Sequence, residues 1–211
     1  DPEQGYRGIS TFIINKNTPG VVVGRDQPMM GLRGTSHVEL FFDEVQLGPE
    51  HLLGEEGRGL ILMLETLGRI RLAQVCASSV GKATKIIQFS TEFAAQRKQF
   101  GQTLDQFQQI QQMLADSAIE INAARLAVLQ TAWEADQGKD VKARISMAKV
   151  QASKTLGRVA DRGVQIFGGL GYCKDLPMER YFRDSRIYRI YDGTSEIHRT
   201  VVAKALSRGE N

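Results

Sequence analysis

One acidic residue stands out as a possible proton acceptor. The stretch RIYRIYDGTSEIHR, residues 186–199, places Asp192 directly before Gly193. Asp-Gly is a common turn pair, because glycine accepts the left-handed backbone that a tight bend needs. Tyr188 and Tyr191 would also give the carboxylate an apolar wall, and in such surroundings a carboxylate is a better proton acceptor. From these residues alone, Asp192 is either a turn residue or a general base.

Two other stretches could hold an anion or a ligand close to the main chain. Arg97 and Lys98 end a predicted helix ahead of Gly101. They either complement the negative end of the helix dipole or bind a phosphate. The glycines of VQIFGGLGY, residues 164–172, either end a helix or let a ligand approach the backbone. They follow a helix and not a strand, so they do not form a Rossmann dinucleotide fingerprint.

The remaining candidates favour structural roles. Arginines recur at every third position from 180 to 189, as expected for a solvated helix face. The three histidines, His37, His51 and His198, lack metal-ligand spacing, and we predict no metal site. We expect Trp133 in the core.

Composition narrows the class of protein. The chain has 211 residues, 42% of them hydrophobic, which is enough for one good core. The net charge of +3 comes from basic residues dispersed among acidic ones, which argues against nucleic-acid binding. Cys76 and Cys173 form no CxxC pair, which favours a reducing compartment. The sequence has no apolar run long enough for a membrane span.

The periodicity divides the chain in two. Residues 9–47 have strand-like stretches with turn glycines, and helical periodicity begins near Glu55. We predict one helix from Val141 to Ile166, a short one over Met178–Ile187 capped by Asp175, and a last helix capped by Thr194 or Ser195. The predicted fold is mainly α: an antiparallel four-helix bundle over residues 53–211, preceded by a partial antiparallel β-domain over residues 1–52.

Five segments together resemble the acyl-CoA dehydrogenase family. They are MGLRGTSHVELFFDEVQLGPEHLLGEEGRGL, RKQFG, QIFGGLGY, RDSRIYRIYDGTSEIHR and VVAKAL, and they occur in the family's order and spacing. The resemblance implies the second part of the family's middle β-domain followed by its C-terminal bundle. The chain would then be the C-terminal portion of a longer enzyme, a homotetramer or dimer, and inactive by itself.

The resemblance also implies the chemistry. The family uses FAD to convert an acyl-CoA to a trans-2-enoyl-CoA in fatty acid β-oxidation, and passes the electrons to an electron-transfer flavoprotein. Such an enzyme would be located in the bacterial cytoplasm or the mitochondrial matrix. Alternatives of the same fold are a divergent acyl-CoA reaction and a non-catalytic module for assembly or nucleic-acid binding.

The family motifs assign roles to individual positions. Asp192 stands where many members have a glutamate base, so its carboxylate is one methylene shorter, by roughly 1.5 Å. Residues implied to meet the substrate are Tyr191, Gly193, Arg69 and Arg71. Those implied to meet FAD are Arg97, Lys98, Gln99, Phe100, Phe107, Gln108, Gln165, Ile166, Phe167, Gly168, Gly169, Thr194, Ser195 and Glu196. Arg71 aligns with the position where other members carry their base, and an arginine cannot take that role.

Overall fold

The computed structural model describes residues 1–209, which form two compact units, Asp1–Gly68 and the chain from Arg69 onward. The first unit contains two short antiparallel ribbons. Strand β1 (Thr11–Phe12) pairs with β4 (Leu52–Leu53), and β2 (Val21–Asp26) pairs with β3 (Val38–Phe42). All five residues of β3 are exposed. A two-stranded ribbon without a buried face is marginally stable by itself.

Short helices complete the first unit. Helix η1 (Pro2–Gly8) is its first element, η2 (Pro49–His51) precedes β4, and α1 (Gly59–Ile70) follows β4 and extends two residues past the boundary at Gly68. The expected strand character of this region is therefore present, but in short segments that pair over long sequence separations.

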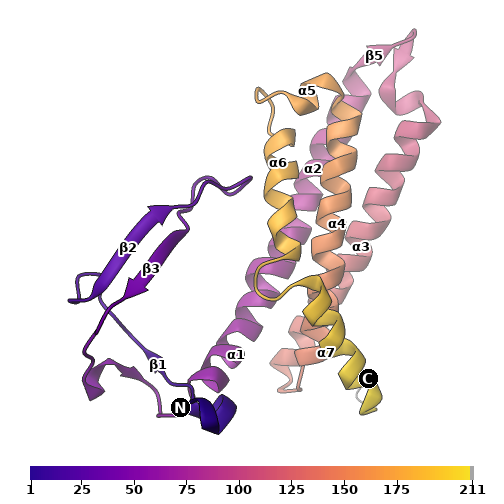
Figure 1. The fold of residues 1–211 in the computed structure, drawn as a ribbon. Coiled ribbons are helices and arrows are strands. Elements are labelled where there is room, and N and C mark those ends of the chain that lie inside the picture. The colour runs from indigo at the N-terminus through magenta and orange to yellow at the C-terminus, as the bar shows by residue number, and fades with distance from the viewer. Residues whose placement is uncertain (210–211) are drawn as a thin grey trace. The chain divides into compact units, whose positions relative to one another are not determined.

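The second unit is a helical bundle. A π-helical segment, η3 (Arg71–Ala77), leads into α2 (Ser78–Gln96). Helices α3 (Gln108–Asp136) and α4 (Lys142–Phe167) follow, and α4 packs against both α2 and α3. Figure 1 shows these three helices alternating in direction, with α6 (Met178–Ser185) returning beside α2 and α4 as the fourth element. This arrangement confirms the predicted mainly α, four-helix fold class.

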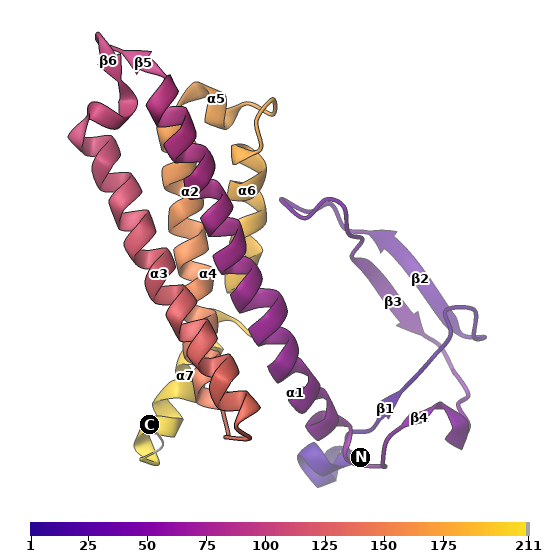
Figure 2. The same ribbon diagram turned by 180° about the vertical axis from the view of Figure 1, so that it is seen from behind.

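Small connecting elements close the two ends of the bundle. The strands β5 (Lys98–Gln99) and β6 (Gln102–Thr103) form a hairpin between α2 and α3, and the 3-10 turn η4 (Leu104–Gln106) follows it. The short α5 (Gly169–Tyr172) lies at the same end, as both views of the ribbon show (Figures 1 and 2). The turn η5 (Arg186–Arg189) and α7 (Ser195–Ser207) complete the chain at the other end.

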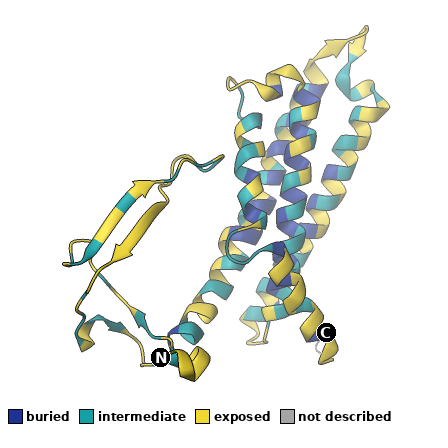
Figure 3. Cartoon of the chain, viewed as in Figure 1, coloured by how far each residue is buried: buried dark blue, intermediate teal, exposed yellow. Residues whose placement is uncertain are grey.

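The core lies where α4 meets its neighbours. Figure 3 shows the buried residues concentrated along α4 and the facing sides of α2 and α3. Gly163 of α4 marks a close approach, because a Cβ there would lie 2.8 Å from Cγ2 of Ile86 in α2. Fully buried apolar members of this core include Val75, Ala83, Ile86, Leu156, Val159 and Met178.

Several expectations about the helices can be compared with the structure. The predicted helix from Val141 to Ile166 is confirmed within one residue by α4. The predicted cap by Thr194 is also confirmed, since its Oγ1 accepts from the N–H of Ile197 at 3.3 Å. The expected cap by Asp175 is wrong: α6 begins after Pro177 without a side-chain cap. The core position expected for Trp133 is wrong as well, because this residue of α3 is 57% exposed.

Candidate active site

The turn that carries Asp192 joins η5 to α7. Its backbone is left-handed at two successive residues, with φ of 53° at Asp192 and 93° at Gly193. A left-handed conformation costs roughly 1–2 kcal/mol at a residue with a side chain, and aspartate is one of the few such residues that adopt it. Gly193 is needed for a second reason, since a Cβ there would lie 3.0 Å from Nε2 of His198.

Three side chains from three elements hold the carbonyl oxygens of this turn. Nε of Arg71, in η3, donates to the Asp192 oxygen at 2.7 Å, and Nζ of Lys149, in α4, donates to the Gly193 oxygen at 2.6 Å. Nε2 of His198, in α7, lies 3.1 Å from the Asp192 oxygen. Hydrogen bonds from charged donors such as Arg71 and Lys149 contribute about 1.5–3 kcal/mol each, and a bond from a neutral donor such as His198 contributes about 0.5–1.5 kcal/mol. Together they can offset the cost of the left-handed backbone.

Lys149 is fully buried on the inner side of α4. Burial lowers the pKa of its ammonium group, and the negative charge of Asp192 opposes that shift. Asp192 is thus the main acidic neighbour of the buried Lys149 ammonium group. The hydrogen bond of 2.6 Å, however, joins Lys149 to the carbonyl oxygen of Gly193 and not to the Asp192 carboxylate. The positive charge of Lys149 favours a negative charge at this turn.

His198 is also buried, and its hydrogen bonds define its protonation. A carbonyl oxygen can only accept, so Nε2 must carry a proton that it donates to the Asp192 oxygen. Burial lowers the pKa of His198, which keeps the ring neutral near pH 7. Nδ1 is then an acceptor and lies 3.0 Å from the hydroxyl of Ser146, which also lies 3.0 Å from the Lys142 carbonyl oxygen, so the two acceptors share one hydroxyl donor. The ring links the turn to the first turns of α4.

The two tyrosines of the predicted aromatic wall pack against each other just before the turn in the chain. The rings of Tyr188 and Tyr191 pack edge to face with centroids 5.3 Å apart. Burial raises the pKa of the Tyr191 phenol, so that group stays protonated. Behind it, burial raises the pKa of the Cys76 thiol to about 12, which leaves this cysteine unreactive.

A second group of predicted residues gathers at the opposite end of the bundle. Arg97, Lys98, Gln99 and Phe100 lie on the β5–β6 hairpin and are exposed, Phe100 to 94%. Phe100 has a φ of 51°, and its ring packs edge to face with that of Phe107 at 6.5 Å. Gln108 begins α3 at the same end and is also exposed.

The end of α4 belongs to the same region. The ring of Phe167 stacks on that of Phe93 in α2 at 4.2 Å, which brings the end of α4 beside the end of α2. Ile166 and Phe167 are buried, whereas Gln165, Gly168 and Gly169 are exposed. A ligand could therefore reach the main chain here, but not the side chains of Ile166 and Phe167.

The structure does not bring the two groups together. On α4, Lys149 contacts the Asp192 turn, and Gln165 belongs to the group at the β5–β6 end of the bundle. These two residues are separated by sixteen positions at about 1.5 Å each, or about 24 Å along the helix. Thr194, Ser195 and Glu196 lie with the Asp192 turn, with Ser195 buried and Glu196 exposed. Arg69 is exposed, and the described residues give it no hydrogen bond or ion pair.

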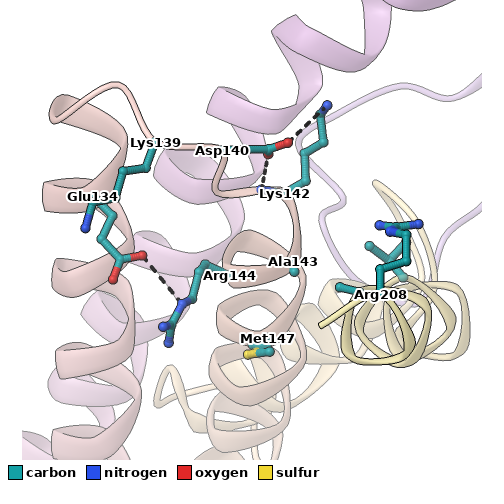
Figure 4. Close-up of a pocket in the computed structure, with 10 residues that line it drawn as sticks. Glu134, Lys139, Asp140, Lys142, Ala143, Arg144, Met147 and Arg208 are labelled. Atoms are coloured by element: carbon teal, nitrogen blue, oxygen red, sulfur yellow. Dashed lines mark hydrogen bonds and ion pairs between the residues drawn. The ribbon is translucent and has the colours of Figure 1, made fainter. Parts of the chain in front are cut away.

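A separate hollow of about 390 Å³ lies where the α3–α4 loop faces α7. Figure 4 shows side chains of both charges around it, with an ion pair of 3.5 Å between Glu134 and Arg144 and another between Asp140 and Lys142. None of the predicted site residues lines it. Among residues 1–209, no helix combines the length and apolar character needed to cross a bilayer, and no acidic, histidine and cysteine side chains cluster as metal ligands.

Sequence reasoning missed Lys149 and treated His198 as an isolated histidine. A signal for Lys149 was available. Lys149 follows Ile145 and precedes Ala152 and Leu156 at helical spacing, on the apolar face of α4. A lysine on such a face needs a hydrogen-bond or charge partner inside the core.

Known proteins resemble this chain over almost its whole length. The model of the acyl-CoA dehydrogenase C-terminal domain matches residues 57–207. The probable acyl-CoA dehydrogenase fadE25 of Mycobacterium leprae is 39% identical over 209 residues, which are 99% of this chain and 54% of that protein.

Two solved structures are equally similar, each with a TM-score of 0.93. One is butyryl-CoA dehydrogenase from Megasphaera elsdenii, 38% identical over 99% of this chain and 54% of that one. The other, described as the electron transferring flavoprotein of Acidaminococcus fermentans, is 39% identical over 99% and 55%. The chain spans about half the length of the relatives it matches. Since the domain model covers most of its residues, the chain belongs to the acyl-CoA dehydrogenase family.

Proposed function

We propose that this chain is the catalytic C-terminal part of an FAD-dependent enzyme that oxidises an acyl-CoA to a trans-2-enoyl-CoA. The observation that carries the proposal is the Asp192 turn: a carboxylate residue directly before the capped start of α7, in a chain of this family. The β-ribbons with exposed faces would be part of a larger β-domain completed by residues outside this chain.

Each residue of the turn has a role in this reaction. The Asp192 carboxylate takes the proton from the α-carbon of the thioester and becomes a neutral acid, while the electron pair of that C–H bond forms the new double bond. The hydrogen on the β-carbon leaves with its electron pair, and bound FAD supplies the acceptor for this hydride. Tyr191 and Gly193 line the thioester, and the aromatic wall excludes water from the carboxylate.

The residues present fit a flavin dinucleotide. Arg97 and Lys98 present exposed cations beside the ring of Phe100, which no contact within residues 1–209 covers. A ligand with phosphates and an aromatic ring system matches this donor set. Thr194, Ser195 and Glu196 would meet FAD at the N-terminal end of α7, where helix N–H groups favour phosphate or hydroxyl oxygens.

The separation of about 24 Å between the two groups favours an assembly of several copies. In such an assembly, one flavin would meet the α7 start of one chain and the β5–β6 hairpin of its neighbour. A stripe on α3 supports self-association, because Leu126, Leu129 and Trp133 lie on one face and are more than half exposed. We therefore propose a homo-oligomer, a dimer or a tetramer.

The electron acceptor and the compartment follow from the same family membership. We propose an electron-transfer flavoprotein as the acceptor, as the description of one similar structure suggests. The two free cysteines fit a reducing compartment, either the bacterial cytoplasm or the mitochondrial matrix. Two features favour a divergent acyl-CoA reaction as the second candidate. The proposed base is shorter than a glutamate, and Arg69 and Arg71 occupy the adjoining substrate region.

The test uses the complete enzyme and a panel of acyl-CoA substrates, with bleaching of the flavin absorbance as the readout. Asp192→Asn removes the base without changing its size, and we expect turnover to fall at least 1,000-fold. Asp192→Glu restores the longer carboxylate and should retain or raise activity on some substrates. Full activity of Asp192→Asn would refute the assignment, and no bleaching by any acyl-CoA would refute the function.

A further inference from the structure

Lys149 is an anomaly that the proposed chemistry does not use. Lysine is almost never fully buried unless it is paired, yet Lys149 has 0% exposure in the middle of a core. It forms no salt bridge with any carboxylate of residues 1–209. Its ammonium group instead donates to a main-chain oxygen, that of Gly193, at 2.6 Å. A neutral core residue would fill this place without the cost of burying a charge.

The hydrogen bond of Lys149 to the Asp192–Gly193 turn suggests a role for its buried charge. Arg71 holds the carbonyl of Asp192 and Lys149 holds the next one, so two successive peptide planes are fixed from two different helices. The first of these planes follows Asp192 and the second follows Gly193, so the two hydrogen bonds fix the backbone on the C-terminal side of the Asp192 side chain. Both residues have the left-handed backbone, with φ of 53° at Asp192 and 93° at Gly193.

A short base needs this control more than a long one. Aspartate has one methylene group fewer than glutamate, so its side chain cannot compensate for a backbone that has moved. A displacement of about 1 Å can cost on the order of 100-fold in rate. We infer that Lys149 and Arg71 are positioning residues, which clamp the Asp192–Gly193 turn so that the shortened carboxylate meets the α-carbon of the thioester. This inference rests on the function proposed above.

Lys149 also interacts with Asp192 through its charge. The negative charge of Asp192 is the strongest electrostatic influence that stabilises the buried ammonium group. Arg71, whose guanidinium group is always charged, acts in the opposite sense and lowers the pKa of Lys149.

The experiment compares Lys149→Met with a matched control in the same helix. Methionine keeps the length of the side chain but removes the charge and the donor. Thr155→Val is the control, because Thr155 is also buried in α4 and its hydroxyl has no hydrogen-bond partner in the structure. Both variants are made in the complete flavoenzyme. We expect Lys149→Met to lower kcat about 100-fold with KM within about threefold, and Thr155→Val to leave both unchanged.

Two further measurements separate positioning from a merely structural role. Amide hydrogen exchange should rise at least about tenfold across residues 190–198 in Lys149→Met, and stay unchanged in α2 and α3. In the Asp192→Glu background, Lys149→Met should cost less than about tenfold in kcat, because the longer side chain can re-aim its carboxylate. A loss of the same size in both backgrounds would overturn the positioning role.

Arg71→Met serves as the second variant if Lys149→Met does not fold. It removes a donor from the other carbonyl of the turn and should raise exchange over the same residues. Normal kcat and normal exchange in either folded variant would overturn the clamp. If no acyl-CoA bleaches the flavin, the proposed function fails, and if Asp192→Asn is fully active, the assignment of Asp192 as the base fails. The exchange experiment then still decides whether Lys149 and Arg71 fix this turn.

Discussion

Replacing Gly163 by alanine should reveal how tightly α4 packs against α2. At an open helix position, alanine is about 0.8–1 kcal/mol more favourable than glycine. At Gly163 the new methyl group would lie 2.8 Å from Cγ2 of Ile86 and 3.4 Å from the sulfur of Met178, and both side chains are fully buried. Overpacking a core costs about 1–3 kcal/mol. We therefore expect a net loss of about 1 kcal/mol.

Gly81→Ala is the matched control, because a Cβ at Gly81 in α2 has nothing within 4 Å. This variant should gain about 1 kcal/mol, so the two substitutions should differ by about 2 kcal/mol. Urea unfolding followed by far-ultraviolet circular dichroism measures both, as a change in midpoint at constant slope. Adding Ile86→Leu moves the clashing methyl group and should recover part of the loss. Equal gains at Gly163 and Gly81 would refute the tight contact.

Three further predictions concern the surroundings of the site. Iodoacetamide should modify the exposed Cys173 and spare the buried Cys76 until the protein is unfolded, as mass spectrometry of the intact chain would show. Because burial lowers the pKa of His198, the unfolded chain takes up a proton below about pH 6.5 that the folded chain refuses, so the free energy of unfolding should decrease as the pH falls through that range. His198→Gln should flatten this dependence in urea titrations, and an unchanged slope would contradict it. Thr194→Ala should cost about 1 kcal/mol by removing the cap of α7, measured by thermal unfolding, whereas Thr200→Ala, on the exposed side of the same helix, should cost a few tenths.

The elements that local chemistry determines could be read from the sequence. The apolar stripe and the flanking loop predicted α4 within one residue, and Thr194 predicted the start of α7. The expectation for Trp133 failed because periodicity shows which residues share a face, but not which face of α3 meets another chain or solvent. The cap at Asp175 failed because a proline two residues later already fixes the backbone at the start of α6.

The candidate site was predictable only in part. The carboxylate and its turn follow from the Asp-Gly pair and the family motifs. The clamp does not, because Arg71, Lys149 and His198 are far apart in the sequence and converge on main-chain oxygens, which carry no residue-specific pattern. Whether Arg71 also meets the substrate, and whether the residues assigned to FAD bind it, stay predictions.

The continuity of α4 restricts where insertions and deletions can occur in homologues of this chain. One uninterrupted helix carries Lys149 near its start and Gln165 near its end, so an insertion of a single residue between them would rotate one end against the other by about 100°. Length variation among homologues should therefore be absent from this segment and accumulate in the α3–α4 loop. Substitutions can alter the Asp192 end of α4 without moving its other end, whereas an insertion within the helix would change how the two ends face each other.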